Sequence, residues 1–511
     1  MATLLPILPI SANSVPPPPP RDTEAPRPTR RIEDGVYLVF GARNAAVYDL
    51  AKGEVHWIER EALEAGPATI SHLGSRLPES VKRALARLRE APIEPLPVER
   101  TDRLRFLWIE LTDGCNLACG HCYASSGGAH RTLVSTAGYR KLLDEAALAG
   151  CELVQFTGGE PLLHPDLLAL VDHARGRKLG VEVYTNLALM TDELARELRS
   201  REVALATSFY SDRAEDHEAV TRVPGSFDAT VASIRRVLAL RMTLRVGVVL
   251  QEGGKERRAE TLAFLRGLGV REDLIRFDEV RPEGRGTERA APASMPSQRD
   301  SCGHEPQRAY SRALSVEHGQ VKAGNCWGGE LDVTAKGEVV PCIFERKLVV
   351  GHVDEGLGAI AAGARARSIW NVKLESCRVC RDCEFRYSCF DCRFMAWRAT
   401  GDLYAKPPAC RYDPYTGRHG EEEALTTAPR RRKDLVLEDV EDGMVALDER
   451  RGEAHALNAT SAAVFDLLDG KRDLESIAGI VAEATGAPLA RVLQDTKKAV
   501  EEFRARGLLE A

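Results

Sequence analysis

The chain has 511 residues, of which 44% are hydrophobic and 29% charged, an ordinary composition for a globular protein. At about 100–200 residues per domain, this length predicts three or four domains. The 70 basic and 76 acidic residues give a formal net charge of −6 at pH 7. That balance argues against a dedicated nucleic-acid binder or a polybasic membrane-surface protein. No apolar run reaches the roughly 18 residues that a spanning helix needs, so we expect neither nucleic acid nor membrane as a partner.

The first 30 residues are rich in proline and show no hydrophobic period, so residues 1–30 predict a disordered Pro-rich leader. The apolar start lacks the basic residues of a signal peptide and is broken by prolines. We therefore expect a cytoplasmic protein whose 13 cysteines stay reduced, because thiols in that compartment rarely form disulfides. Metal binding is the first explanation for so many cysteines.

Residues 31–97 predict a small N-terminal α+β domain. Apolar runs at 36–42, 45–49 and 55–58 are typical of short strands joined by tight turns. Residues 78–88 follow with the period of an amphipathic helix, and a proline stands in its first turn.

Residues 98–285 alternate between strand and helix patterns. The predicted strands lie at 106–111, 153–156, 181–184, 204–209, 243–250 and 274–279. Helical patterns lie between them near 136–149, 166–178, 191–199, 227–240 and 256–268. This alternation is typical of a parallel sheet, so the predicted fold class is α/β, with six units forming a partial (β/α)6 barrel. In barrels of this type, the chemistry takes place on the loops at the C-terminal ends of the strands.

The remaining chain changes character twice. In residues 286–417 the regular periods fade, and nine of the thirteen cysteines fall in this segment, which predicts a metal-stabilised domain. Residues 418–433 are a predicted linker. Residues 434–511 predict a strand, a turn, a second strand and two or three helices, a small winged-helix-like α+β domain. The segments 33–66 and 438–468 share a loose pattern, which hints at two related small domains.

A compact cysteine motif directly follows the first strand of the predicted barrel. Cys115, Cys119 and Cys122 lie on one short loop, with three residues between the first two and two residues between the last two. Three thiolates can hold three corners of a four-iron cluster and leave the fourth iron open to a small chelating molecule, whereas electron-transfer clusters normally have four cysteines. A zinc loop is the alternative. Cys151, on an apolar stretch, is interpreted as a buried structural thiol.

This motif, together with Gly-Gly-Glu-Pro at 158–161, resembles the radical S-adenosylmethionine (SAM) enzymes over roughly residues 100–285. The resemblance implies a [4Fe-4S] cluster whose open iron binds SAM. It also implies reductive cleavage of SAM to a 5′-deoxyadenosyl radical, with an electron donor such as flavodoxin or ferredoxin. In such enzymes the cofactor does the hard chemistry, and the protein positions it and excludes water.

The resemblance also assigns residues to SAM binding, at the ends of the second to fourth strands and in nearby loops: His121, Gly158, Gly159, Glu160, Thr185, Asn186, Ser208 and Arg222. The two glycines allow a close backbone approach, and Glu160 is expected to accept the SAM ammonium group. His121 stands where the family usually has an aromatic residue beside adenine. No residue is nominated as a catalytic base.

The cysteines of residues 326–410 resemble the SPASM extension of radical SAM enzymes, which binds two auxiliary four-iron clusters. By the connectivity of that family, the outer cluster has Cys380, Cys383, Cys389 and Cys410 as ligands, and the inner cluster has Cys326, Cys342 and Cys392. The usual fourth inner cysteine is missing, because none stands within 327–341. Cys302 or Cys377 is the candidate substitute, or one iron is open to substrate. Two zinc sites are the alternative, since thiolates also suit zinc.

Residues 434–511 resemble the peptide chaperone of pyrroloquinoline quinone biosynthesis (PqqD), the prototype of RiPP recognition elements; RiPPs are ribosomally made, modified peptides. Such domains bind a leader peptide as an added strand at a sheet edge. A DNA-binding winged helix is the alternative. Against it, the predicted hairpin is acidic at Glu438, Asp439, Glu441 and Asp442, whereas phosphate contacts need basic side chains.

Together these features predict a radical SAM peptide maturase. It would bind a ribosomal precursor peptide through its C-terminal domain and modify the core, with a cross-link as the favoured product. An anaerobic sulfatase-maturase-like enzyme acting on a folded protein is the alternative, and the leader-binding domain argues against it. A catalytically inactive peptide-binding protein is disfavoured, because Cys115, Cys119 and Cys122 are all present.

Overall fold

A computed structural model describes the chain from residue 28 to residue 510. Within that span it leaves out 51–53, 59, 61–78, 88–89, 97–100, 129–131, 251–256, 289–324, 388, 390–391, 408–409, 411, 420–428, 471, 473, 486 and 488. Most of the predicted leader and Cys302 therefore lie outside the described residues.

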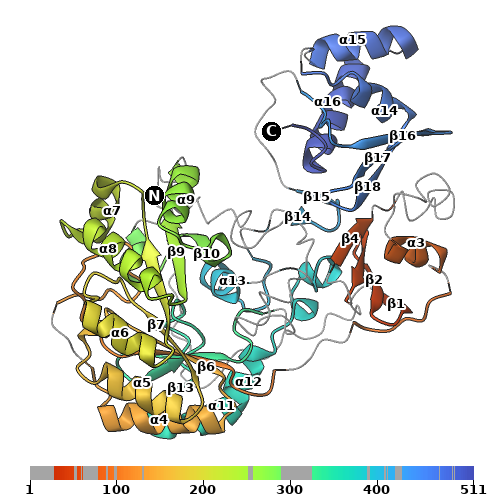
Figure 1. The fold of residues 1–511 in the computed structure, drawn as a ribbon. Helices are drawn as coiled ribbons and strands as arrows, with labels where there is room; N and C mark the ends of the chain where they lie inside the picture. The colour runs from red at the N-terminus through yellow and green to blue at the C-terminus, as the bar shows by residue number, and fades with distance from the viewer. Residues whose placement is uncertain are drawn as a thin grey trace, which may run out of the picture.

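Six parallel strands form the sheet of the barrel region, at the lower left of Figure 1. Its strands are β5 (Phe106–Glu110), β6 (Leu153–Thr157), β7 (Gly180–Tyr184), β8 (Ala204–Phe209), β9 (Leu244–Leu250) and β10 (Ile275–Glu279). The connecting helices are α4 (Thr136–Leu148), α5 (Leu167–Gly176), α6 (Asp192–Ser200), α7 (Ala214–Thr221), α8 (Ser226–Ala239) and α9 (Arg258–Gly267). The strands pair in chain order, which confirms the predicted partial barrel. Helix α7 was not predicted.

The period of the apolar residues explains this arrangement. Along β5, Leu107 and Ile109 are completely buried and belong to the same core as Leu142 and Leu143 of α4. Successive side chains of a strand point to opposite faces, so Glu110 and the neighbouring polar residues face the barrel interior. The sheet thus has an apolar helix-covered face and a polar inner face, which suits a site inside the barrel.

The cysteine-rich region extends the same sheet. Strand β11 (Glu330–Val333) pairs in parallel with β5, and β12 (Glu338–Val340) and β13 (Gly351–His352) follow, so the sheet has nine strands. The helices of this region are α11 (Leu357–Ala362), α12 (Ala364–Trp370) and α13 (Arg393–Thr400), and a small hairpin joins β14 (Tyr412–Asp413) to β15 (Arg418–His419). The sequence did not predict that this region pairs with the first barrel strand.

In its described residues, the N-terminal module is an antiparallel sheet with the helix α3. Its elements are β1 (Thr29–Glu33), β2 (Val36–Phe40), β3 (Ala45–Asp49), β4 (Glu54–Ile58) and α3 (Glu79–Ala86). Three of these strands match the predicted ones. The strand β1 begins inside the segment predicted as a disordered leader, because residues 29–33 find β2 as an antiparallel partner.

The C-terminal module contains β16 (Val436–Val440), β17 (Gly443–Asp448), β18 (Glu453–Asn458), α14 (Ala459–Asp466), α15 (Leu474–Thr485) and α16 (Leu489–Ala505). The turn at 441–442 was predicted, but the module has three strands rather than two. The third strand begins with Glu453 and contains His455, and it has no β-branched residue and no Phe, Tyr or Trp, so its strand signal is weak.

The two terminal modules share one sheet. Strand β4 runs parallel to β18, with Ile58 opposite Ala454, and the strand order is β1-β2-β3-β4-β18-β17-β16. Val445 and Leu447 of β17 lie in the same buried cluster as Val36 and Leu38 of β2. Figure 1 shows the two modules side by side, in red and in blue. The sequence predicted two separate small domains, whereas the structure joins their strands.

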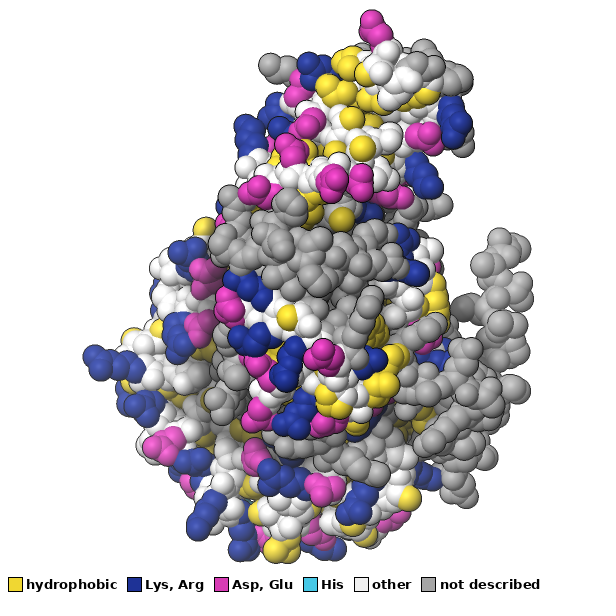
Figure 2. Space-filling model, turned by 90° about the vertical axis from the view of Figure 1, so that its right-hand side faces the viewer, with side chains coloured by type: hydrophobic (Ala, Val, Ile, Leu, Met, Phe, Trp, Pro, Cys, Tyr) yellow, Lys and Arg dark blue, Asp and Glu magenta, His cyan; other side chains and the backbone are white. Residues whose placement is uncertain are grey.

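The surface carries both signs of charge. On the face in Figure 2, basic and acidic side chains are interspersed over both the upper and the lower part of the molecule, with small apolar patches between them. Among the described helices, none is both long and apolar enough to cross a membrane.

Candidate active site

The cysteine loop begins where β5 ends and is held by the end of β6. The N–H of Gly159 donates to the Thr112 carbonyl over 2.7 Å, and that of Glu160 donates to the Gly114 carbonyl over 2.9 Å. Gly158 has φ +127°, and a Cβ there would lie 2.4 Å from the Thr112 oxygen. These glycines are therefore needed for close packing of two backbone segments.

The three sulfurs of this loop meet hydrogen-bond donors. The backbone N–H of Leu117 donates to Cys115 Sγ over 3.4 Å, and that of Ser126 donates to Cys122 Sγ over 3.4 Å. Cys119 Sγ lies 3.9 Å from the hydroxyl of Tyr210. Donors aimed at sulfur suit thiolates, the form in which cysteine binds metal. This environment fits a thiolate-bound cluster.

Burial disfavours the charged thiolate forms of Cys115 and Cys119 relative to their neutral thiols. It raises the pKa of Cys115 to about 12 and that of Cys119 to about 11. A nearby metal charge would reverse this preference, because a coordinating thiol is deprotonated outright. Across the described residues, no three His, Cys, Asp or Glu side chains are arranged to hold one metal ion. The roles of the three cysteines as cluster ligands stay predictions.

Helix α7 and Arg285, neither of which was predicted to contact the cysteine loop, hold the backbone of that loop through hydrogen bonds. At the C-terminal end of α7, the carbonyls of Val220 and Thr221 accept the N–H groups of Gly120 and Ala118, each over 3.0 Å. Arg285, after β10, donates to the carbonyls of Cys119 and Ser126, each over 2.8 Å. The only sequence signal for Arg285 is its place between two glycines, close to the end of the sixth strand.

Glu160 is fully buried beside the loop and contacts two other predicted SAM residues. Its carboxylate accepts the Thr185 hydroxyl over 2.7 Å and the backbone N–H of Asn186 over 2.8 Å, and it also accepts the N–H of Leu162 over 3.0 Å. Burial raises the pKa of Glu160 to about 7, and these hydrogen bonds oppose the shift. The structure thus brings Glu160, Thr185 and Asn186 together, and SAM binding by them stays a prediction.

Asn186 connects this group to the cysteine loop. Its side-chain amide donates to Asn116 Oδ1 over 2.8 Å and lies 3.9 Å from Cys115 Sγ. The other predicted SAM residues are further along the strand ends. Ser208 Oγ lies 3.1 Å from the Tyr184 hydroxyl, and Arg222 is an exposed residue with φ +59° at the C-terminal end of α7.

Tyr210 was missed by the sequence reasoning, although it directly follows β8. Its ring meets that of His121 edge-on, with centroids 5.1 Å apart, and also that of His217 at 5.0 Å. Burial raises the pKa of Tyr210 well above its usual value, so its hydroxyl stays protonated. Tyr210 thus forms one aromatic wall beside Cys119 and His121.

An ion pair inside the barrel connects β5 to the cysteine-rich region. Arg346 binds both carboxylate oxygens of Glu110, over 2.5 and 2.9 Å. Asp332 of β11 is completely buried near this pair. Burial and then the Glu110 charge raise the pKa of Asp332 well above its usual value. The sequence carried no signal for this cluster, because Glu110 precedes both Asp332 and Arg346 by about 220 residues or more.

Five of the predicted auxiliary ligands fall into two groups of neighbours. Burial raises the pKa of Cys383 well above its usual value, and the nearby Glu384, Cys380 and Cys410 raise it further. Burial likewise raises the pKa of Cys342, with Cys392 as the next cause. The group around Cys383 belongs to the predicted ligand set of the outer cluster. The pair of Cys342 and Cys392 belongs to that of the inner cluster. Cluster binding by these cysteines stays a prediction, and Cys302 lies outside the described residues.

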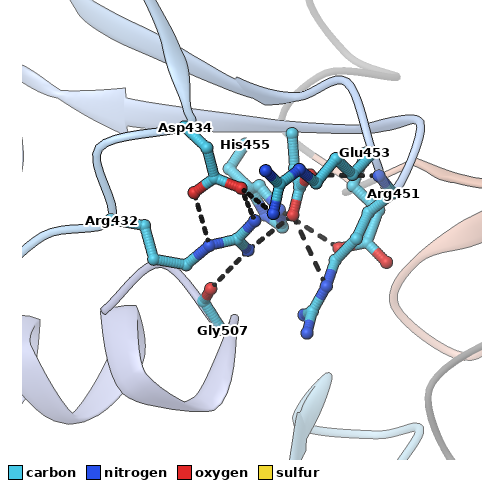
Figure 3. Close-up of polar contacts among 8 residues, drawn as sticks. Arg432, Asp434, Arg451, Glu453, His455 and Gly507 are labelled. Carbon is cyan, nitrogen blue, oxygen red and sulfur yellow. Dashed lines mark hydrogen bonds and ion pairs between the residues drawn. The ribbon is translucent and has the colours of Figure 1, made fainter. Parts of the chain in front are cut away.

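The C-terminal module is stabilised by a charged network at the base of its hairpin (Figure 3). Arg432 binds Asp434 over 2.8 Å and the buried Asp448 over 2.6 Å, and it also donates to the Gly507 carbonyl over 3.0 Å. Nearby, Nε2 of the buried His455 lies 3.4 Å from Glu453 Oε2. Arg432 therefore connects the segment before β16, the end of β17 and the chain after α16.

Three protein-family models match the chain. The Radical SAM superfamily model matches residues 109–265, the SPASM iron-sulfur cluster-binding domain matches 326–384, and the model of coenzyme PQQ synthesis protein D (PqqD) matches 443–509. The matched segments correspond to the barrel, the cysteine-rich region and the C-terminal module. They confirm the three predicted resemblances.

Curated relatives include an AdoMet-dependent heme synthase of Methanosarcina barkeri, 27% identical over 357 residues, which are 62% of this chain and 99% of that protein. The PqqA peptide cyclase of Streptomyces rochei is 27% identical over 67% of this chain and 95% of its own length. The mycofactocin maturase MftC of Mycobacterium tuberculosis is 33% identical, over 35% of this chain and 45% of that protein. The chain thus matches less than half of MftC.

Among solved structures, Streptococcus suis SuiB bound to its precursor peptide SuiA has a TM-score of 0.47 with this chain at 12% identity. That similarity covers 75% of this chain and 100% of the other.

Proposed function

Since residues 109–265 match the radical SAM superfamily model and are followed by matches to the SPASM and PqqD models, we propose that this enzyme cleaves SAM reductively and modifies a ribosomally made precursor peptide. The observation that carries the proposal is the PqqD domain on the same chain as the radical SAM barrel. Two of the relatives above, a PqqA peptide cyclase and a mycofactocin maturase, have names that agree with peptide maturation.

In this proposal, Cys115, Cys119 and Cys122 hold a [4Fe-4S] cluster, which supplies the electron for SAM cleavage when it is bound. Asn186 orients the loop through Asn116, and Arg285 fixes the backbone behind Cys119. The rings of Tyr210 and His121, which meet edge-on, would shield one side of the loop from water. The barrel is thereby prepared to protect a reactive radical, as such cofactor enzymes require.

The finer parts of the proposal concern the SPASM region and the partners. We propose two auxiliary four-iron clusters, with the outer and inner ligand sets given above. They would accept the electron that a substrate radical must lose to form a closed-shell cross-link. A flavodoxin or ferredoxin would supply the electron for SAM cleavage. We propose a cytoplasmic location, because thiolate ligands are kept reduced in that compartment.

The PqqD domain would bind the leader of the precursor by adding it as a strand to a sheet edge. Main-chain hydrogen bonds would supply affinity, and side-chain pockets would select the sequence. Binding energy from the leader, which is remote from the reacting carbon, would then position the core peptide in the barrel.

The direct test is anaerobic reconstitution of the full chain with iron, sulfide, SAM and the peptide encoded by a short reading frame beside its gene. Mass spectrometry should show a peptide lighter by two hydrogens if a cross-link forms, together with 5′-deoxyadenosine. An unchanged peptide alongside a modified sulfatase would instead favour the protein-maturase alternative. A modified porphyrin would favour a reaction like that of the heme synthase relative.

A further inference from the structure

One side chain of the N-terminal module, Trp57 of β4, contacts both the cysteine-rich region and the PqqD domain. Its indole N–H donates to Glu384 Oε1 over 2.8 Å. The same ring packs against His455 of β18 in a tilted arrangement, with centroids 5.3 Å apart and the planes inclined at 54°. Trp57 is therefore packed between a residue next to Cys383 and a strand of the PqqD domain.

Glu384 is the buried residue of the cysteine-rich region that accepts the Trp57 hydrogen bond. It is completely buried, and its Oε1 also accepts the Tyr412 hydroxyl over 2.5 Å. A Cβ on Gly41 would lie 2.3 Å from its other oxygen, so the turn between β2 and β3 needs a glycine at this contact. The carbonyl of Glu384 accepts the Tyr48 hydroxyl over 2.9 Å. Both its side chain and its backbone are thus bound by the N-terminal sheet.

The rest of the loop after Cys383 is bound in the same way. Arg386 donates to the Phe40 carbonyl of β2 over 2.8 Å and to the Cys383 carbonyl over 2.9 Å. Phe385 and Tyr387 pack against the buried cluster on this face of the sheet, which contains Tyr48. The predicted outer cluster ligand Cys383 therefore lies in a loop whose shape is set by the N-terminal module.

On the other side, the module is joined to the PqqD domain by strand pairing and packing. Ile58 pairs with Ala454, and a Cβ on Gly452 would lie 2.5 Å from His56 Nδ1. The buried cluster under the sheet combines residues of both modules, including Val36 and Leu447. A smaller contact places α16 beside β15 of the cysteine-rich region. The N-terminal module supplies most of the described junction.

We propose that residues 31–97 act as an intramolecular adaptor, which fixes the PqqD domain at a set position relative to the auxiliary-cluster region, with Trp57 as its central positioning residue. This inference rests on the proposed function. A leader-binding domain on a free tether would present the core peptide over a broad range of positions. A fixed domain restricts the reach of the core, so that only residues at a set distance from the leader arrive at the radical.

The first experiment needs no peptide. Full-length Trp57→Phe keeps a ring beside His455 but loses the hydrogen bond to Glu384, and Trp57→Ala loses both. Hydrogen exchange in Trp57→Ala should speed up in β4, in β18 and in the loop at 383–387 together, while the barrel strands keep their protection. Val81→Ala, in a buried residue of α3 that takes no part in the Trp57 contacts, is the matched control for general loosening of the module. Unchanged exchange in either β18 or the 383–387 loop would overturn the proposal.

The second experiment uses precursors with leader–core spacers that differ in length. The wild type should modify only a narrow range of spacers. Trp57→Ala should lower kcat on the native spacer by about tenfold and broaden the range, with unchanged leader affinity and unchanged SAM cleavage without peptide. An unaltered spacer profile in a variant that still binds leader would overturn the adaptor role alone. A wild type that modifies no precursor would overturn the proposed function and this inference with it.

Discussion

The guanidinium of Arg393 donates a hydrogen bond to the sulfur of Cys377 over 3.1 Å, and both residues are completely buried. The same Nη1 also donates to the carbonyls of Leu403 and Ala405. A buried guanidinium is costly unless it has partners, and the Cys377 sulfur is one of them. This geometry favours a structural role for Cys377 over that of a substitute cluster ligand.

We therefore predict that Cys377→Ser keeps the full iron content of the reconstituted protein, because the hydroxyl can still accept from Arg393. Cys383→Ser should instead lose about four irons per chain, the content of one cluster. Iron and sulfide analysis with electron paramagnetic resonance of the reduced protein would measure both. Loss of a cluster signal in Cys377→Ser would make it a ligand after all.

The cysteine loop of the barrel should be separable from the auxiliary sites. Replacing Cys115, Cys119 and Cys122 together with alanine removes every predicted thiolate of the SAM cluster, so production of 5′-deoxyadenosine should stop. The auxiliary clusters should remain, since their predicted ligands lie in a different region. Chromatography of the nucleoside products provides the measurement. Continued 5′-deoxyadenosine formation by the triple variant would contradict the assignment.

The total metal content tests the number of clusters. Ten cysteines in three ligand sets imply three four-iron clusters, or about twelve irons per chain. Elemental analysis after anaerobic reconstitution should show this ratio with little zinc. About four irons together with near-stoichiometric zinc would assign the cysteine-rich region to zinc instead.

His217 should make the barrel less stable in acid. It is buried among Phe209, Tyr210 and Phe227, and burial lowers its pKa to about 4. The unfolded chain, with a usual histidine pKa near 6.5, binds the proton first as the pH falls. The contribution of the neutral ring to the free energy of unfolding is therefore complete above about pH 6.5 and is lost toward pH 4. Between pH 7 and pH 5 the free energy of unfolding should fall by about 2 kcal/mol.

Thermal unfolding of the wild type and of His217→Phe at pH 7 and pH 5 would measure this effect. The variant has no proton to take up at this position, so its melting temperature should fall less between the two pH values. Identical pH dependence in the two proteins would show that His217 is not the group responsible. A further pair of measurements at pH 7 and pH 8 should show no difference attributable to this residue.

Arg432 should be a determinant of the stability of the PqqD domain. Its partner Asp448 is only 1% exposed, so Arg432→Met leaves a buried carboxylate with a weaker partner, Arg451. Removing one member of a buried pair costs about 3 kcal/mol. Lys433→Met, at the exposed neighbouring position, is the matched control. Calorimetry should show a lower unfolding temperature for the first variant, and equal temperatures for both would contradict the prediction.

The sequence alone predicted the six strands of the barrel and all of its connecting helices except α7. The six strands are apolar runs between helical periods, and that signal is local, because a strand and the helix after it are encoded in adjacent residues. The cysteine motifs were recognised for the same reason, since their ligand spacing lies within a few residues. Helix α7 was missed because its sequence, AEDHEAVT, has too few apolar residues to show a period.

Only the tertiary structure decided which distant segments meet. The pairing of β11 with β5, the bidentate contact of Arg346 with Glu110 and the shared sheet of the two terminal modules all join residues more than 200 positions apart. Strand pairing depends on backbone hydrogen bonds, which every residue offers alike. The choice of partner therefore follows from the shape and burial of the whole fold, and no local pattern at Ile58 or Trp57 marks the strand or the carboxylate that each one contacts.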